Sequence, residues 1–102
     1  MLTHVVMIRF VDDATDGQVA ALVEGLRALP DQIPEIRSYT VGRDMGLVDG
    51  NCDLAVVGQF ASAADLRTYL DHPAHVALVA DLLEPVSASR TRIQFPSPDR
   101  EP

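Results

Sequence analysis

The sequence is organised around the stretch Tyr69-Leu70-Asp71-His72-Pro73-Ala74-His75-Val76-Ala77-Leu78, which holds two of its three histidines. Proline suits the first position of a helix, because its fixed φ matches the helix and its missing N–H loses no bond there. A residue before proline also avoids helical geometry. The pair His72-Pro73 therefore predicts a helical break, with His72 as N-cap of a new helix and His75 in its first turn.

His75 is expected to face the protein interior. Val79, Leu82 and Val86 follow it at helical spacing and share one apolar stripe with its ring. The positive end of the helix dipole and burial both disfavour imidazolium. We therefore expect a neutral imidazole that can accept a proton near pH 7. The alternative is a structural histidine whose ring nitrogen bonds a backbone carbonyl.

Length and composition indicate one small folded domain. The chain has 102 residues, of which 47% are hydrophobic and 23% charged, as in a globular protein with one core. Its formal net charge of −7 disfavours nucleic acid and anionic membranes as partners. No stretch approaches the roughly 20 apolar residues of a membrane span, and no signal-peptide pattern is present, so we expect a cytoplasmic protein.

The sequence predicts neither a disulfide nor a metal site. The single cysteine, Cys52, favours a half-buried strand residue over a reactive thiol. Of His4, His72 and His75, only the last two are close in sequence, and no carboxylate has a clear position as a third ligand. The glycines do not form a phosphate-binding spacing. We expect no cofactor.

Alternation and helical periodicity predict elements in the order β-α-β-β-α-β. Thr15 and Gln18 fit a capping box that opens the first helix, and Pro30 is expected to close it. The second helix opens at Ser62 and runs to Leu83, with its break before Pro73. Strands are expected at residues 2–11, 35–45, 53–60 and 86–95. Residues 1–95 then form the domain, and residues 96–102 a disordered tail.

This order is the ferredoxin-like arrangement, an α+β fold with a four-stranded antiparallel sheet and helices on one face. Both faces of the first strand are largely apolar. The face expected to meet the helices carries His4, Val6, Ile8 and Phe10, and the face expected to stay open carries Val5 and Met7. We expect the open face to pair with a second copy in a homodimer. Arg90 and Arg92 would form ion pairs near that partner.

Three stretches resemble the stress-responsive A/B barrel (Dabb) family: the strand Thr3–Phe10, the Ile33-Pro34 turn and, most specifically, Tyr69–Val76. The resemblance runs over residues 2–95. It implies a ferredoxin-like fold whose dimers close two sheets into a shared α+β barrel. A plant polyketide cyclase of this family closes a linear polyketide by an intramolecular aldol step.

The resemblance also implies roles for single residues. In that cyclase a histidine at the position of His75 is the general base, a tyrosine at the position of Tyr69 lies beside it, and a histidine matching His4 lines the pocket. The cyclase has a further tyrosine in its first helix, where this chain has Leu26. We therefore expect catalytic roles for His75, Tyr69 and His4, and a substrate pocket formed by His72, Val6, Ile8, Leu26, Tyr39 and Val79.

Three functions fit these residues. The first is a cofactor-independent cyclase, lyase or isomerase acting on a β-keto, polyketide-like substrate. His75 would remove a carbon-bound proton, His4 and Tyr69 would donate to the enolate oxygen, and Tyr69 would alternatively hold the tautomer of His75. The second is a non-catalytic, stress-responsive dimeric module that binds a hydrophobic small ligand, which Leu26 favours. The third is a cofactor-free monooxygenase, which the absence of tryptophan disfavours.

Overall fold

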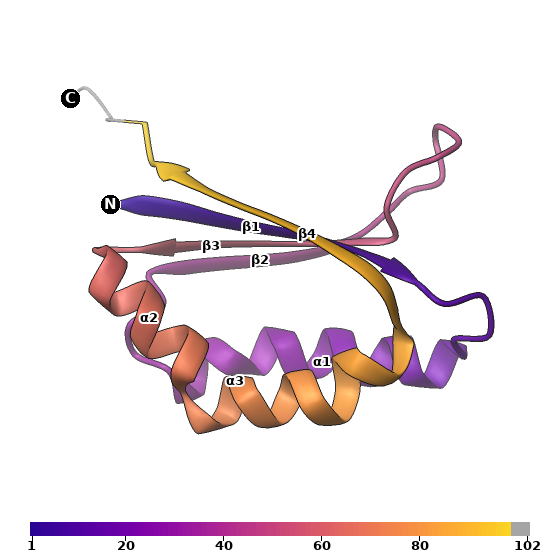
Figure 1. Cartoon of the computed structure of the whole chain (residues 1–102), viewed down its shortest axis with the longest axis horizontal. Helices are drawn as coiled ribbons and strands as arrows, with labels where there is room; N and C mark the ends of the chain where they lie inside the picture. The colour runs from indigo at the N-terminus through magenta and orange to yellow at the C-terminus, as the bar shows by residue number, and fades with distance from the viewer. Residues whose placement is uncertain (99–102) are drawn as a thin grey trace.

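The computed structural model describes residues 1–98, which form a four-stranded antiparallel sheet with helices along one face (Figure 1). The strands are β1 (Leu2–Phe10), β2 (Ser38–Arg43), β3 (Leu54–Phe60) and β4 (Ser87–Pro96), in the spatial order β2-β3-β1-β4. The helices are α1 (Asp16–Gln32), α2 (Ala63–Asp71) and α3 (Pro73–Leu78). The predicted ferredoxin-like fold is confirmed.

The central strand β1 points alternate side chains into the core and onto the open face. His4 and Ile8 are 2% and 1% exposed beneath the helices, whereas Met7 on the other face is 40% exposed. In β3, Leu54 and Phe60 are buried in the same way. The expected faces are confirmed, and the His4 ring lies in the layer between sheet and helices.

Helix α1 begins as predicted but ends later. Thr15 Oγ1 accepts a hydrogen bond from the Gln18 N–H, and Gln18 Oε1 accepts one from the Thr15 N–H. The expected end at Pro30 is wrong, because Pro30 lies inside the helix. A proline removes one hydrogen bond from a helix, but the Ile33 N–H beyond it still donates to the Leu29 carbonyl. That bond closes the last turn around the proline.

The second helical region is divided before Pro73, as predicted, and then changes its winding. Two short segments follow α3, a π-helical turn (Val79–Leu83) and a 3₁₀ turn (Glu84–Val86). A π turn places more residues in each turn and so rotates the side chains after it. Leu83 is therefore buried, while the expected core residue Leu82 is only partly buried.

Helix α1 lies close to α3 and the π turn because residue 25 is glycine (Figure 1). A Cβ atom built on Gly25 would lie 3.0 Å from Leu82 Cδ1 and 3.2 Å from Leu78 Cδ1. Carbon atoms in contact normally lie about 3.5–4.0 Å apart. An alanine at this position would therefore require the Leu78 and Leu82 side chains to shift by a few tenths of an ångström.

The sheet holds part of the segment expected as a tail. Strand β4 runs to Pro96, the Ser97 N–H donates to the Met1 carbonyl, and the Ser97 and Thr3 hydroxyls lie 2.7 Å apart. The rest of the expected tail, residues 99–102, lies outside the described residues. Within residues 1–98, none of the helices has the length and apolar character required to cross a membrane.

The Thr15 cap gives a first prediction. Replacing Thr15 with alanine leaves the Gln18 N–H without its acceptor, so Thr15→Ala should lower the free energy of unfolding by about 1 kcal/mol. Urea unfolding at fixed protein concentration measures this. The control is Thr68→Ala, since Thr68 bonds only the Ala64 carbonyl within α2 and alanine is the better helix former there. An unchanged free energy of unfolding in Thr15→Ala would show that the cap does not stabilise α1.

Candidate functional site

Tyr69, His75 and His4 meet between the sheet and the helices. The Tyr69 ring centre lies 4.5 Å from that of His75 and 6.2 Å from that of His4. Tyr69 and His4 are each 2% exposed, and His75 is half-buried. The structure therefore brings together the three side chains for which catalytic roles are predicted.

The helical break at Pro73 sets the hydrogen bonds around His75. In a continuous helix the Leu70 carbonyl would accept a bond from the Ala74 N–H, four residues further on. Here the Ala74 N–H donates to His72 Nδ1 at 3.0 Å, and the Leu70 carbonyl lies 3.2 Å from His75 Nδ1. A carbonyl oxygen only accepts, so His75 Nδ1 carries the proton and Nε2 presents a lone pair.

Tyr69 does not hold the tautomer of His75, which was one of its two expected roles. Its hydroxyl instead lies 2.6 Å from the hydroxyl of Tyr39, which comes from β2. Burial raises the pKa of both phenols. Both therefore stay protonated, and since one proton lies between the two oxygens, the other is free for an acceptor outside the pair.

Most of the predicted pocket residues line one internal cavity. Its volume is about 40 Å³, room for about one water molecule. Seven predicted residues are in its wall, namely Val6, Ile8, Leu26, Tyr39, Tyr69, His75 and Val79. His4 is not in the wall and meets the site through its edge-on contact with Tyr69. The structure places His72 at the start of α3, where its ring caps the helix.

A larger groove lies on the outer side of His75. It has a volume of about 310 Å³ and is lined by Leu70, His75, Val76, Val79, Ala80 and Glu84. His75 and Val79 line both the groove and the internal cavity. The imidazole thus stands between a small, partly open cavity and an outer groove of ligand size.

Gln94 is a site residue that the sequence analysis did not single out. Its side-chain Nε2 lies 2.8 Å from His4 Nδ1, and the two residues are directly opposite in the register of β1 and β4. Alternation puts Gln94 on the same face of the last strand as Arg90 and Arg92. The signal missing from the sequence is the register, because His4 and Gln94 are 90 positions apart.

Both buried imidazoles are held neutral. Burial is the main cause that lowers the pKa of His75 below its ordinary value of 6.5; the bond to Leu70 opposes this effect and the charge of His72 adds to it. Burial also lowers the pKa of His4, and a proton on His75 and the charge of Arg92 act in the same direction. Within residues 1–98, no three His, Cys, Asp or Glu side chains are grouped to hold a metal ion.

The sequence matches the Stress Responsive A/B Barrel Domain, Dabb, over residues 2–97. This chain belongs to the Dabb family. An uncharacterized protein of Streptomyces coelicolor is 33% identical to it over 82 residues, which cover 78% of this chain and 84% of that protein.

Solved structures share the Dabb fold of this chain. A dimeric ferredoxin-like protein of Thermobifida fusca is 38% identical, with a TM-score of 0.87 over 94% of this chain and 90% of that one. A dimeric protein of Bacteroides fragilis with a ferredoxin-like fold is 26% identical, with a TM-score of 0.81 over 94% and 95%. A hydroxynitrile lyase of Passiflora edulis, 17% identical, shares the fold with a TM-score of 0.83 over 99% and 96%.

The lowered histidine pKa values predict that this Dabb domain loses stability in mild acid. Well above pH 6.5 both rings are neutral in the folded and the unfolded chain. As the pH falls through 6.5, the unfolded chain binds protons that the folded chain does not, so the free energy of unfolding falls. The loss levels off below the pKa values of the folded state.

Urea unfolding between pH 8 and pH 5 measures this loss, at fixed protein concentration. The double variant His4→Gln/His75→Asn keeps every carboxylate and removes both rings, so it should lose less stability over this range. A decrease as large as that of the wild type would exclude the two histidines as its source.

Proposed function

We propose that this Dabb domain is a small-molecule enzyme in which His75 Nε2 acts as the general base. The supporting observation is the bond of His75 Nδ1 to the Leu70 carbonyl, which leaves the lone pair on Nε2. Burial keeps the ring neutral, and a neutral imidazole accepts protons near pH 7. Tyr69 and Tyr39 place a hydroxyl donor in the same cavity wall. A base beside a positioned donor suits proton removal next to a carbonyl.

The proposed substrate is a β-keto, polyketide-like chain. His75 Nε2 takes a proton from the carbon between two carbonyl groups, and the free phenol proton of the Tyr39–Tyr69 pair bonds the enolate oxygen. The enolate carbon then forms a carbon–carbon bond with a more distant carbonyl carbon of the same chain. The alkoxide that results takes the proton back from the His75 imidazolium. No electrons are gained or lost, so this ring closure needs no redox partner.

The plant cyclase has a tyrosine in its first helix, where this chain has Leu26. We propose that Tyr39 takes over the role of that tyrosine. Both residues line the internal cavity, but Tyr39 enters it from strand β2, whereas Leu26 enters it from helix α1. The second phenol of this site therefore approaches from the sheet side. We infer that the substrate oxygen it binds has a different position from that in the plant cyclase, and so a different substrate or ring closure.

The proposed substrate enters from the outer groove. The internal cavity of about 40 Å³ is too small for a polyketide chain, whereas the groove of about 310 Å³ has a suitable volume and shares His75 and Val79 with it. The π-helical turn begins at Val79, and such turns are frequent at functional sites. An outward shift of this turn would join the two spaces.

The fold is compatible with lyase chemistry. The Passiflora edulis protein of the same fold is a hydroxynitrile lyase. At 17% identity this likeness is one of fold alone. The proposal for this chain therefore depends on the geometry of its own His75, Tyr69 and Tyr39.

The variant His75→Asn tests the general base. Its amide can still donate to the Leu70 carbonyl, but it has no nitrogen lone pair to take the proton. Turnover of linear β-polyketide thioesters, followed by chromatography of the cyclic product, should fall by about 100-fold or more. Thr68→Ala, on the exposed side of α2, is the control and should keep wild-type turnover. Full activity of His75→Asn would refute the proposed base.

A non-catalytic module that binds a hydrophobic small ligand is the second candidate. The mainly apolar lining of the outer groove favours it. In that case an apolar ligand should raise the melting temperature with no turnover of any β-keto substrate. The cytoplasmic location expected from the sequence stays a prediction.

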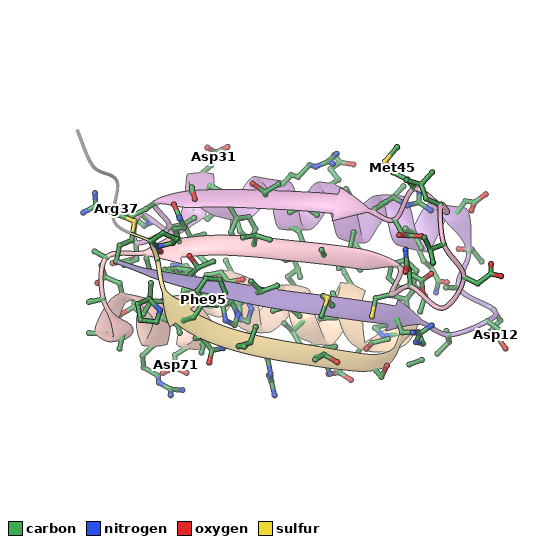
Figure 2. All side chains as sticks on the ribbon, turned by 90° about the horizontal axis from the view of Figure 1, so that it is seen from above. Asp12, Asp31, Arg37, Met45, Asp71 and Phe95 are labelled. Carbon is green, nitrogen blue, oxygen red and sulfur yellow. The ribbon has the colours of Figure 1, made fainter. Side chains whose placement is uncertain are left out.

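We propose further that the open sheet face pairs with a second copy in a homodimer. A cross-strand row of Val57, Val5 and Ile93 runs over this face, flanked by Met7 and Phe95. Figure 2 views this face of the sheet and labels Phe95 on it. Ile93 is 56% exposed, and a connected apolar surface of this kind is typical of an interface. The Thermobifida fusca and Bacteroides fragilis structures are both of dimeric proteins.

Ile93→Asp tests the sheet interface. A carboxylate at the β4 end of the apolar row would be buried in the interface without a partner, so the variant should elute as a monomer. Size-exclusion chromatography with light scattering measures the mass. Val76→Asp is the matched control, because Val76 is 53% exposed but lies on helix α3. Loss of the dimer in the control variant alone would place the interface on the helical side.

A further inference from the structure

We propose that Gln94 is a positioning residue that fixes His4 in the tautomer with its proton on Nε2, so that His4 donates hydrogen bonds and His75 is the only free base of the site. The tautomers follow from geometry alone, and their use in catalysis rests on the proposed function.

The contact between Gln94 and His4 defines the tautomer. The Gln94 amide nitrogen lies 2.8 Å from His4 Nδ1. An amide nitrogen donates and does not accept, so His4 Nδ1 must be the acceptor. The proton of the neutral ring is then on Nε2. Because β1 and β4 pair these two residues directly, the register of the sheet brings the exposed Gln94 side chain next to the ring.

His75 has the opposite tautomer for an equally local reason. Its Nδ1 donates to the Leu70 carbonyl, so its Nε2 presents a lone pair. The two rings lie on either side of Tyr69, with centre-to-centre distances to it of 6.2 Å for His4 and 4.5 Å for His75. One ring therefore offers an N–H group and the other a lone pair, the arrangement that an acid and a base require.

The groups around His4 keep it from becoming a second base. Its ring is 2% exposed, and the charges that act on it come from His75 and Arg92, both of which oppose its protonation. If the proton were on Nδ1, the lone pair of the His4 ring would be on Nε2, as it is in His75. In the orientation it has here, the Gln94 amide disfavours this tautomer, because its NH₂ group would face the Nδ1–H group. The role of Gln94 therefore requires the amide to keep its nitrogen towards the ring.

His72 provides an internal reference for the Nε2–H tautomer. Its Nδ1 accepts a bond from the Ala74 N–H, so it too must carry its proton on Nε2, without any part played by Gln94. The structure therefore predicts two histidines with Nε2–H and one with Nδ1–H. Of His4 and His72, only His4 should change its tautomer when residue 94 is replaced.

Long-range ¹H–¹⁵N spectra of the imidazole rings at pH 8 test the proposal in the resting protein. Each ring is assigned by the loss of its signals in His4→Gln, His72→Asn and His75→Asn. The wild type should show Nε2–H for His4 and His72 and Nδ1–H for His75. An Nδ1–H pattern or an averaged pattern for His4 would overturn the proposal.

Two variants at position 94 separate positioning from a structural role. In Gln94→Glu the carboxylate accepts from Nδ1–H, so the His4 pattern should switch to Nδ1–H and its pKa should rise. In Gln94→Ala the pattern should average. Arg92→Gln, on the same face of β4, is the control and should leave the Nε2–H pattern of His4 unchanged. An unchanged pattern in Gln94→Glu would refute the role of Gln94.

Activity adds a readout that keeps this proposal distinct from the proposed function. With β-polyketide thioesters, Gln94→Glu should lower kcat by about tenfold or more with little change in KM, because His4 meets the site through Tyr69, whose phenol pair bonds the enolate, and not through the bound substrate. If the tautomers are as predicted and no thioester is turned over by the wild type, the cyclase function fails and the role of Gln94 stands. If turnover is found and Gln94→Glu keeps the wild-type kcat, the role of Gln94 in catalysis fails.

Discussion

The site depends on the missing N–H of Pro73. Without it the Tyr69 carbonyl loses its helical partner and accepts a bond from the His72 N–H instead. The Ala74 N–H then turns to the His72 ring, and the Leu70 carbonyl is left for His75. One covalent feature of the backbone therefore caps a helix, orients an imidazole and decides which of its nitrogens carries the proton.

The polar groups of the site are stable in an apolar core because they bond one another. Leaving a buried donor or acceptor without a partner costs about 1–3 kcal/mol. Tyr39 pairs with Tyr69, His4 with Gln94, and His75 with a backbone carbonyl. Among the described residues, no buried side-chain nitrogen or oxygen lacks a partner. Such a network also restricts the packing to one arrangement, which keeps the two histidines and the two phenols in fixed relative positions.

The sequence predicted the fold because its signals are local. Alternation in residues 2–11 and 53–60, the capping box at Thr15 and the pair His72-Pro73 each act within a few residues, and their order defines the topology. The prediction that α1 ends at Pro30 was wrong, because a proline is tolerated in the last turn when the next hydrogen bond, from the Ile33 N–H to the Leu29 carbonyl, still forms. The π turn after Leu78 was missed because the same apolar residues fit a π or an α winding.

The sequence predicted which residues form the site better than it predicted the hydrogen bonds between them. His75, Tyr69 and His4 could be named from the family resemblance and the periodicity. The bond between Tyr39 and Tyr69, and that between His4 and Gln94, join strands and helices far apart in sequence. They depend on strand register and on the distance between layers, which no local pattern contains. The small size of the internal cavity likewise follows from tertiary packing.

The absence of a side chain at Gly25 lets helix α1 pack closely against the segments that carry the site. The atoms that a side chain there would meet belong to Leu78 and Leu82, on the segments that also carry His75 and Val79. A methyl group at this position would require the side chains of Leu78 and Leu82 to shift. The packing of the segments that line the site is thus sensitive to a residue that lines neither the cavity nor the groove.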